Sequence, residues 1–403
     1  MPDLVLRSVQ SDEELHRATD LMAKCHEPVY FESMRWLQTF ANGYPGFLRE
    51  HTRIALSDGE LAGALRLSTD TVRIGEARLK MGGFGWVTTD PRHRHKGVAR
   101  ELMCDTLRYM AQHHYHVSML FGIPNFYHRF GFTSSLAEYS TSVDTFEAST
   151  ARHNGYRVRE AKPGDIPAIQ KMHHAHDADV SCSLVRSRAH ITNRWDRWKP
   201  VSVLTDENGK VIAYSLPRRG RDEFQVIEVG VAGPQACGAL LHACSQAALE
   251  ECAPRIIFMA PPCHPFVRYL LQFKSSHEMR IQRDEGGMMA FVDLGETLES
   301  MIPEWESTLM RNVARDHHVE VTLLVDRKPF RVRSHRGAVD VTPNSGANKV
   351  SLTEAELMHL ITGYRYLEEI LSRQRRILSP EARDLLAAMF PKRTAYVWRQ
   401  DRF

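Results

Sequence analysis

The hydrophobic positions in the first third of the chain alternate between the spacing of a helix and that of a strand. Ser11 and Glu14 form a capping box ahead of apolar residues at helical spacing. Asp58-Gly59 separates two strand-like runs and predicts a hairpin. A glycine-rich strand over residues 77–87, a helix with one apolar face over residues 99–110 and a strand over residues 117–122 follow. This alternation is typical of an α/β unit.

The same order of elements then begins again. Asn208-Gly209 marks a second hairpin, 150 residues after the first. Pro91 and Phe130 have counterparts at Pro234 and Phe273, both 143 residues later. A drift of a few residues between such offsets is what loop deletions produce. The spacing therefore predicts two copies of one α/β unit.

From about residue 299 the pattern changes to paired strands followed by helices. Thr353 and Glu356 form another capping box, and Ser379-Pro380 begins a last helix that Pro391 ends. We therefore expect an α/β (α+β) fold in three parts: residues 1–150, residues 151–298 as the second copy, and residues 299–403 as a smaller α+β unit.

The overall charge excludes nucleic-acid binding as the main activity. The chain has 403 residues, with 52 basic against 49 acidic side chains. Affinity for nucleic acid needs a clustered basic face, which such a balance does not predict. The sequence shows no signal peptide and no apolar run near the roughly 20 residues that span a bilayer. We expect a cytoplasmic protein with no membrane partner.

The cysteine and histidine patterns predict no metal site. The seven cysteines are scattered and never spaced as a close ligand pair. Two histidine clusters, residues 113–116 and 173–176, could be metal ligands or solvated helix surface. Because neither cluster is joined by a second ligand pair, we expect helix surface.

The segment between the glycine-rich strand and the following helix carries the first candidate chemistry. Arg92, Arg94, Lys96 and Arg100 surround Gly97. Unpaired N–H groups at a helix N-terminus attract a phosphate, and a glycine there lets the backbone approach it closely. The segment is therefore either a pyrophosphate site or an ordinary basic surface loop.

A resemblance to a known family favours the phosphate site. GGFGWVTTDPRHRHKGVARELM, residues 82–103, resembles motif A of the GNAT N-acetyltransferases, in which this loop holds the pyrophosphate of acetyl-CoA. IPNFYHRFGF, residues 123–132, is similar to the segment after the next strand in that superfamily. The whole chain, including Phe403, resembles the Eis (enhanced intracellular survival) type. That resemblance implies tandem GNAT-like units, the second degenerate, a sterol-carrier-protein-like C-terminal unit and a homo-oligomer, often a hexamer.

The resemblance also implies which residues hold acetyl-CoA. Backbone groups of Trp86, Val87 and Thr88 would face the pantetheine arm, where the family parts two strands. Asn125 lies in the family's second cofactor-contacting segment. The residues around the phosphates would be Arg92, His93, Arg94, Lys96, Gly97, Val98 and Ala99.

Two catalytic groups follow from the same resemblance. Tyr127 would protonate the departing CoA thiolate, which suits a phenol that titrates near 10 beside a thiol that titrates near 8.5. Its alternative role is a half-buried aromatic that anchors a short helix. The α-carboxylate of Phe403 would deprotonate the amine, directly or through water, whereas an ordinary terminus would be a mobile tail.

The acceptor pocket is the least determined part of the site. Trp36 and Phe84 fall where the family lines this pocket with aromatic residues, although each could equally be a core residue. Glu27 or Glu32 could supply negative charge, and Asp401 is a second carboxylate that could attract a cationic amine. The penultimate residue is Arg402, where an acidic residue would help to bind a polycationic acceptor.

The second copy is expected to lack the cofactor. At the 143-residue offset, Arg94 corresponds to Cys237, Gly97 to Leu240 and Tyr127 to Leu270. We therefore expect one active site, which transfers acetyl from acetyl-CoA to a primary amine of an aminoglycoside, a polyamine or a lysine by direct attack in a ternary complex. The alternative is a carrier of acyl-CoA or lipid without catalytic activity.

Overall fold

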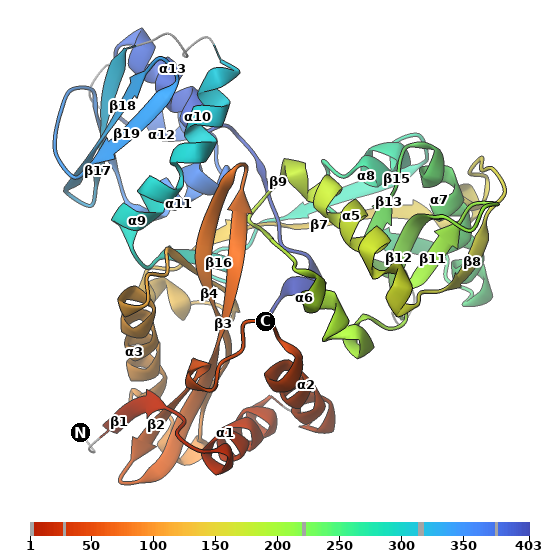
Figure 1. Ribbon diagram of the computed structural model, residues 1–403, viewed down its shortest axis with the longest axis horizontal. Helices are drawn as coiled ribbons and strands as arrows, with labels where there is room; N and C mark the ends of the chain where they lie inside the picture. The colour runs from red at the N-terminus through yellow and green to blue at the C-terminus, as the bar shows by residue number, and fades with distance from the viewer. Residues whose placement is uncertain (1–3, 27–29, 220–222, 313–317, 375–377) are drawn as a thin grey trace. The chain divides into compact units, whose positions relative to one another are not determined.

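The computed structural model describes residues 4–26, 30–219, 223–312, 318–374 and 378–403. Contacts between residues divide the chain into two compact units. The first unit contains residues 1–135, residues 282–392 and Phe403, and the second contains residues 136–281 and 393–402. Each unit is built on its own sheet, with helices against it (Figure 1).

The first unit contains a large mixed sheet that positions the candidate site. Its strands, in spatial order, are β1 (Leu4–Ser8), β2 (Thr52–Ser57), β3 (Glu60–Ile74), β4 (Ala77–Thr89), β5 (Val117–Gly122), β16 (Gly286–Phe291) and β6 (Thr133–Leu136). Helix α3 (Val98–Gln112) covers one face, and helices α1 (Asp12–Cys25) and α2 (Tyr30–Gly43) cover the other (Figure 1). β4 and β5 are parallel, as the helix α3 between them requires.

Both faces of this sheet are buried against apolar side chains. On the α3 face, Leu102 and Met103 pack with Phe84 and Leu120 in one cluster. On the other face, Met22 of α1 and Leu37 of α2 pack against the sheet in a second cluster. Burial on both faces explains why β5 is a nearly continuous apolar run.

The second unit contains a sheet with the same spatial order of strands. Its strands are β15 (Ser275–Arg280), β7 (Glu138–Asp144), β14 (Arg255–Phe258), β13 (Phe224–Val231), β12 (Val211–Arg219), β11 (Ser202–Thr205) and β8 (Arg157–Glu160). Its helices are α4 (Thr145–Ser149), α5 (Ile166–His176), α6 (Arg188–Thr192), α7 (Gln235–Glu250) and α8 (Pro265–Leu270). Read from β8 to β15, each strand has a counterpart in the first sheet read from β1 to β6.

One pair of strands occupies places that chain order does not suggest. β7 belongs to the predicted first copy, residues 1–150, yet it lies between β14 and β15 in the second sheet. β16 belongs to the predicted second copy, residues 151–298, yet it pairs with β5 in the first sheet. Each sheet therefore takes one strand from beyond its stretch of sequence. The division at residues 150 and 298 stays a prediction about the chain, since it differs from the grouping by contacts.

The C-terminal part of the first unit forms a separate four-stranded sheet. Its strand order is β19 (Ala338–Thr342), β18 (Lys328–His335), β17 (Val319–Val325) and β20 (Lys349–Leu352). The helices of this part are α9 (Leu294–Ser300), α10 (Ile302–Met310), α11 (Glu354–Thr362), α12 (Leu367–Leu371) and α13 (Pro380–Met389). The short strands β9 (Val180–Ser181) and β21 (Thr394–Ala395) pair in the second unit.

Most local predictions are confirmed. Hairpin turns occur at Asp58-Gly59 and Asn208-Gly209, where both glycines have positive φ. Thr353 and Glu356 form the predicted capping box of α11. At α1 only half of the predicted box is present: Ser11 accepts from the Glu14 N–H, but the Glu14 carboxylate accepts from the Gln10 N–H.

Candidate active site

The candidate site begins where β4 and β5 part. The two strands are paired from Met81 with Val117 to Phe84 with Leu120, and the pairing ends there. β4 continues to Thr89 and β5 to Gly122, so their last residues are not bonded to each other in the described structure. The backbone of β4 beyond Phe84 can therefore bind a ligand along its free edge.

A bulge in β4 lies at this parting. Ala64 of β3 pairs with Thr88, but Arg66 pairs with Gly85, so Trp86 and Val87 together face one residue of β3. Trp86 has a φ of 56°, which is unusual for a residue with a side chain. Bulges are common next to active sites because they redirect side chains. Here Trp86 packs with the α1 and α2 cluster, whereas Val87 packs with the α3 cluster.

The loop after β4 ends at an open helix N-terminus. Gly97 is the N-cap of α3, with φ 84°, and no side chain in the described structure caps the helix there. A Cβ added at Gly97 would meet no atom within 4 Å. The N–H groups of Val98 and Ala99 are in the first turn and point out of the helix at this open end. The arrangement fits an anion of pyrophosphate size.

The basic side chains of the loop fall into two groups. Arg94, Lys96 and Arg100 are exposed around Gly97. Arg92 is also exposed, but its guanidinium donates to Asp90 at 3.1 Å and lies 3.5 Å from Glu60. The contact with Arg92 lowers the pKa of Asp90. Arg92 would have to leave these carboxylates to reach a phosphate. Arg100 has a looser partner, since its guanidinium lies 4.0 Å from the Glu101 carboxylate.

His93 lies at a hollow beside the same helix end. Its Nδ1 is buried without a hydrogen-bond partner among the described residues. A cavity of about 190 Å³ is lined here by His93, Lys96 and Val98, together with Leu4 and Leu6 of β1. A ligand at the N-terminus of α3 could therefore extend into this hollow.

Tyr127 lies at the end of β5. A Cβ added at Gly122 would lie 2.6 Å from a ring atom of Tyr127, so the absent side chain makes room for the phenol ring. The ring also meets Phe126 and Phe132 edge to face, with centroids 4.9 Å and 6.3 Å apart. Burial raises the pKa of Tyr127. The phenol is therefore held in its protonated form at neutral pH.

Asn125 precedes Tyr127 in an exposed turn. Its φ is 57°, and its N–H donates to the carbonyl of Asp284 at 2.9 Å. This bond fixes the backbone of the segment that leads into the short helix Tyr127–Phe130. The side chain of Asn125 is exposed, so it is free to face a ligand.

Phe403 lies on β4, directly at the parting. A Cβ added at Gly83 would lie 2.5 Å from ring atoms of Phe403, and one added at Gly85 would lie 3.2 Å from its terminal carbon. The ring also meets Phe121 of β5, with centroids 6.1 Å apart. Glycine at both positions is thus required for the terminal residue to approach the strand this closely. In this structure the end of the chain is a packed element.

The phenol and the terminal carboxylate lie on opposite faces of the sheet. Side chains alternate along a strand, and Leu120 belongs to the α3 cluster. Gly122, against which Tyr127 packs, therefore points to the α3 face. Phe121 and Gly85, which contact Phe403, point to the other face. A group placed in the gap between β4 and β5 would meet an acid on one side and a base on the other.

The structure places the predicted acceptor residues in different surroundings. Trp36 packs on Trp86 with ring centroids 5.3 Å apart, so it belongs to the face that carries Phe403. Phe84 is a core residue, only 3% exposed and packed edge to face on Phe132. Glu32 is exposed in the first turn of α2. Glu27 lies outside the described residues.

Asp401 differs from its expected role. Its side chain is 0% exposed and forms an ion pair with Arg186 at 2.6 Å. Its negative charge is therefore neutralised inside the second unit and does not face an acceptor. The sequence pattern could not show this, because Arg186 precedes Asp401 by 215 residues.

Two further residues lie at this site that the sequence did not suggest, Ser68 and Arg66. Ser68 of β3 lies opposite Gly83 and is 2% exposed, and its Oγ has no hydrogen-bond partner within the part of the chain that is described. Arg66 lies opposite Gly85, donates to the Leu37 carbonyl at 3.0 Å, and has a pKa lowered to about 10 by burial. The alternation of glycine at residues 83 and 85 was the available signal, since it marks a close approach.

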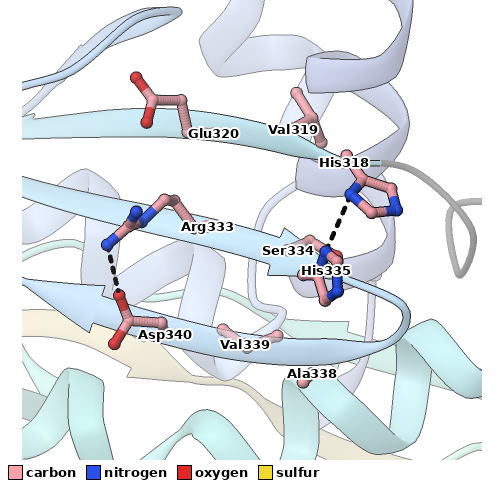
Figure 2. A pocket seen from close by; sticks show the side chains of 9 residues that line it. All are labelled: His318, Val319, Glu320, Arg333, Ser334, His335, Ala338, Val339 and Asp340. Carbon is pink, nitrogen blue, oxygen red and sulfur yellow. Dashed lines mark hydrogen bonds and ion pairs between the residues drawn. The ribbon is translucent and has the colours of Figure 1, made fainter.

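A second hollow lies on the four-stranded sheet, at the ends of β17 and β18. Its volume is about 650 Å³, and His318 and His335 line it side by side, with their Nδ1 atoms 2.8 Å apart (Figure 2). Arg333 pairs with Asp340 on the neighbouring strand at 3.3 Å (Figure 2). Throughout the described ranges, no group of three or more His, Cys, Asp or Glu side chains is arranged to hold a metal ion. Nor does any described helix combine the length and the apolar character that crossing a membrane needs.

Comparison with known families identifies the first part of the chain. Residues 6–134 match the acetyltransferase (GNAT) domain family. The match begins within β1 and includes β2 to β5, the loop at Gly97 and Tyr127. No curated protein matches the sequence.

Solved structures share the fold along the whole chain. A GCN5-related N-acetyltransferase from Kribbella flavida is 19% identical, with 100% of this chain and 99% of that chain covered and a TM-score of 0.75. One from Anabaena variabilis ATCC 29413 is 16% identical, with both chains fully covered and a TM-score of 0.76. Eis1 from Mycobacterium abscessus is 16% identical, again with full coverage of both chains, and has a TM-score of 0.64. At these identities the likeness shows a shared fold.

The domain match and the shared fold confirm the GNAT part of the resemblance. Residues 6–134 match an acetyltransferase (GNAT) domain, which supports an acyltransferase enzyme. The solved structures show that the mixed α/β fold of the chain contains GNAT-like sheets.

Proposed function

We propose that the protein transfers acetyl from acetyl-CoA to a primary amine of a small cationic acceptor, by direct attack in a ternary complex. The observation that carries this proposal is the meeting of three features at one place: the parted strands, the open N-terminus of α3, and the pair Tyr127 and Phe403. A carrier of acyl-CoA would need the first two features but neither a buried phenol nor a terminal carboxylate at the gap.

The residues at the parting fit acetyl-CoA. The N–H groups of Val98 and Ala99 at the open helix end, with Arg94 and Lys96 beside them, suit the pyrophosphate. The free edge of β4 at Trp86, Val87 and Thr88 suits the amide groups of the pantetheine arm. His93, Ala99 and Asn125 complete the proposed set. Arg92 would join it after leaving Asp90 and Glu60.

Two groups of the chain would transfer the protons, the α-carboxylate of Phe403 and the phenol of Tyr127. The Phe403 carboxylate takes a proton from the ammonium group of the acceptor, which frees the nitrogen lone pair to attack the thioester carbonyl carbon. As the carbon–sulfur bond breaks, Tyr127 donates its phenolic proton to the departing thiolate. The nitrogen loses its second proton to solvent, and the Tyr127 phenolate takes a proton from solvent. The products are an N-acetyl amine and CoA. The amine attacks directly in this scheme, so no acetyl-enzyme forms on Cys or Ser.

The acceptor site would lie on the face of Phe403, Trp36 and Glu32. One aromatic face and two carboxylates can attract a primary ammonium group. Phe84 packs in the α3 cluster on the opposite face of the sheet, so it is not part of this proposed acceptor site. Aminoglycosides, polyamines and lysine side chains all carry such an amine.

The wider description rests on the resemblance to the Eis type. It comprises a degenerate second GNAT-like unit, a sterol-carrier-protein-like C-terminal unit, a cytoplasmic location and a homo-oligomer that could be a hexamer. The equal strand order of the two sheets supports the tandem units. Light scattering of the purified protein measures the oligomer.

The test measures thiol release from acetyl-CoA with a panel of polyamines, aminoglycosides and lysine peptides. At least one amine should raise thiol release well above the rate without acceptor. Appending one alanine after Phe403 moves the carboxylate by a residue and should lower kcat by about 10²-fold, since small displacements of a base cost this much. Unchanged kcat in that variant would remove the carboxylate from the mechanism, and no release with any amine would favour the carrier.

A further inference from the structure

A cluster of charged side chains is fully buried in the second unit. Arg186 donates to both carboxylate oxygens of Glu228, at 2.7 Å and 2.9 Å, and to both of Asp401, at 2.6 Å and 2.9 Å. All three side chains are 0% exposed. Tyr214 donates to Glu228 at 2.8 Å, and His190 lies 3.4 Å from Asp401. The proposed chemistry uses none of these groups.

This cluster binds the C-terminal segment, residues 394–402. Asp401 belongs to that segment, whereas Arg186 and Glu228 belong to the body of the second unit. Charges buried this deeply cost much free energy unless they are paired, so the Asp401 carboxylate has to stay beside Arg186. The cluster therefore acts as a fastening point for the segment.

The rest of the segment is bound along its length. Thr394 and Ala395 form β21, which pairs with β9. The Trp398 indole N–H donates to Asp177 at 2.9 Å, and the carbonyl of Gln400 accepts from Arg194 at 2.9 Å. Trp398 is 1% exposed. The segment thus resembles a peptide ligand that is held by strand pairing, a buried aromatic anchor and an ion pair.

The segment lies where the strands of the second sheet part. β13 and β14 are paired only as far as Val226 with Phe258, and Glu228 follows on the free part of β13. The Tyr396 hydroxyl donates to the Met259 carbonyl, directly after β14, at 3.0 Å. Residues 394–402 thus occupy the place in the second unit where the central strands part.

We propose that Arg186 and Asp401 are positioning residues for acetyl transfer, because their ion pair holds the segment whose next residue is Phe403. The inference rests on the proposed role of the Phe403 carboxylate. Phe403 is two residues beyond Asp401, so a segment that is loose at Asp401 leaves the carboxylate free to move. Arg186 touches neither substrate and acts only through the segment.

The test compares two Asp→Asn variants of the full-length protein. Asp401→Asn removes the charge that faces Arg186. Asp165→Asn is the matched control: Asp165 also forms a close ion pair in the second unit, with Arg159 at 2.6 Å, but its other contact is the Lys162 N–H. Arg186→Lys is a further variant, which keeps the positive charge but loses the bidentate hydrogen bonds of the guanidinium.

Two measurements are made on each variant. The first is the rate at which carboxypeptidase A releases Phe403, which reports how often the terminus leaves its place. The second is the separate determination of kcat and of KM for acetyl-CoA. Asp401→Asn should raise the release rate about tenfold or more and lower kcat about tenfold, with KM for acetyl-CoA changed by less than about twofold. Arg186→Lys should move both quantities in the same direction by less.

The outcomes separate this proposal from the proposed function. Wild-type values for release and kcat in Asp401→Asn would overturn it, and so would equal changes in Asp165→Asn, because general loosening of the unit would then explain them. Failure of the proposed function has a different signature: the appended alanine would leave kcat unchanged, while the release rate in Asp401→Asn would still rise.

Discussion

The two sheets have one strand order and differ at the place where their central parallel strands part. In the first unit the parting is followed by an exposed helix N-terminus, with Gly97 in a left-handed conformation. In the second unit the N-cap of helix α7 is Pro234, in a right-handed conformation, so no left-handed glycine lets a ligand approach the backbone there. A Cβ at Gly238 would collide with the carbonyl oxygen of Arg152, and Leu240 is 0% exposed. One frame is open to a ligand and the other is closed by its own chain.

This difference shows which residues serve the fold and which serve a ligand. The apolar strands and the helix after the parting are needed in both units, because each sheet must be covered. The basic loop, Gly97 and Tyr127 are needed only where the parting stays open. The comparison therefore predicts that substitutions at these positions affect activity in the first unit and only stability in the second.

The largest expected effect is that of Tyr127→Phe. Loss of the phenolic proton should lower kcat by roughly 10²-fold or more, with little change in KM for acetyl-CoA. Tyr269→Phe is the matched control, since Tyr269 lies in the corresponding segment of the second unit, and it should leave kcat unchanged. Steady-state kinetics at saturating amine measure both. Equal losses in the two variants would contradict the assignment.

The second unit should also lose stability in acid. Burial lowers the pKa of His190 from 6.5 to about 4 and that of His173 well below 6.5. Because the unfolded chain binds these protons more readily, stability is complete above about pH 6.5 and is lost as the pH falls toward 4. His190 alone should cost about 2 kcal/mol at pH 5.

Urea unfolding at pH 7.5 and pH 5 measures this loss. His190→Gln should reduce the difference between the two pH values by the amount assigned to His190. A pH difference that is the same with and without the histidine would contradict the assignment.

Glycine substitutions separate strain from ligand binding. Gly97→Val and Gly209→Val both place a β-branched residue at positive φ, with no atom within 4 Å of the new Cβ. Each should lose about 1–2 kcal/mol of stability. Only Gly97→Val should also raise KM for acetyl-CoA, by about tenfold, because the new side chain stands where the pyrophosphate would approach. A similar rise in Gly209→Val would mean that strain alone explains it.

The smallest expected effect concerns Arg94. Arg94→Ala should raise KM for acetyl-CoA about fivefold, the loss of one exposed charge-assisted contact. S-acetyl-pantetheine lacks the pyrophosphate, so its KM should not change in the variant. Equal increases in KM for both thioesters would show that Arg94 does not contact the phosphates.

Local structure could be predicted from the sequence because local signals determine it. Glycine after Asp58 and after Asn208 demands a hairpin turn, and the residues from Arg94 to Ala99 mark the loop before α3. The exchange of β7 and β16 could not be predicted, because alternation marks a strand but not its partner. Nor could the burial of Asp401, since Arg186 and Glu228 reach it only in the folded chain.

The same distinction between local patterns and distant contacts applies to the candidate site. Tyr127 and the basic loop lie in one continuous stretch with a family resemblance. Phe403 contacts Gly83 and Gly85, which are distant from it in sequence, so no local pattern could predict the contact. Only the family resemblance suggested it. Ser68 and Arg66 were missed because a serine and an arginine in a strand carry no signal of their own.

The central claim is that acetyl-CoA binds at only one of the two places where central parallel strands part. Calorimetric titration with CoA tests this claim most directly. The account predicts one CoA bound per chain in the wild type, about tenfold weaker binding in Gly97→Val, and unchanged binding in Gly209→Val. Two CoA molecules per chain, or full affinity in Gly97→Val, would contradict it.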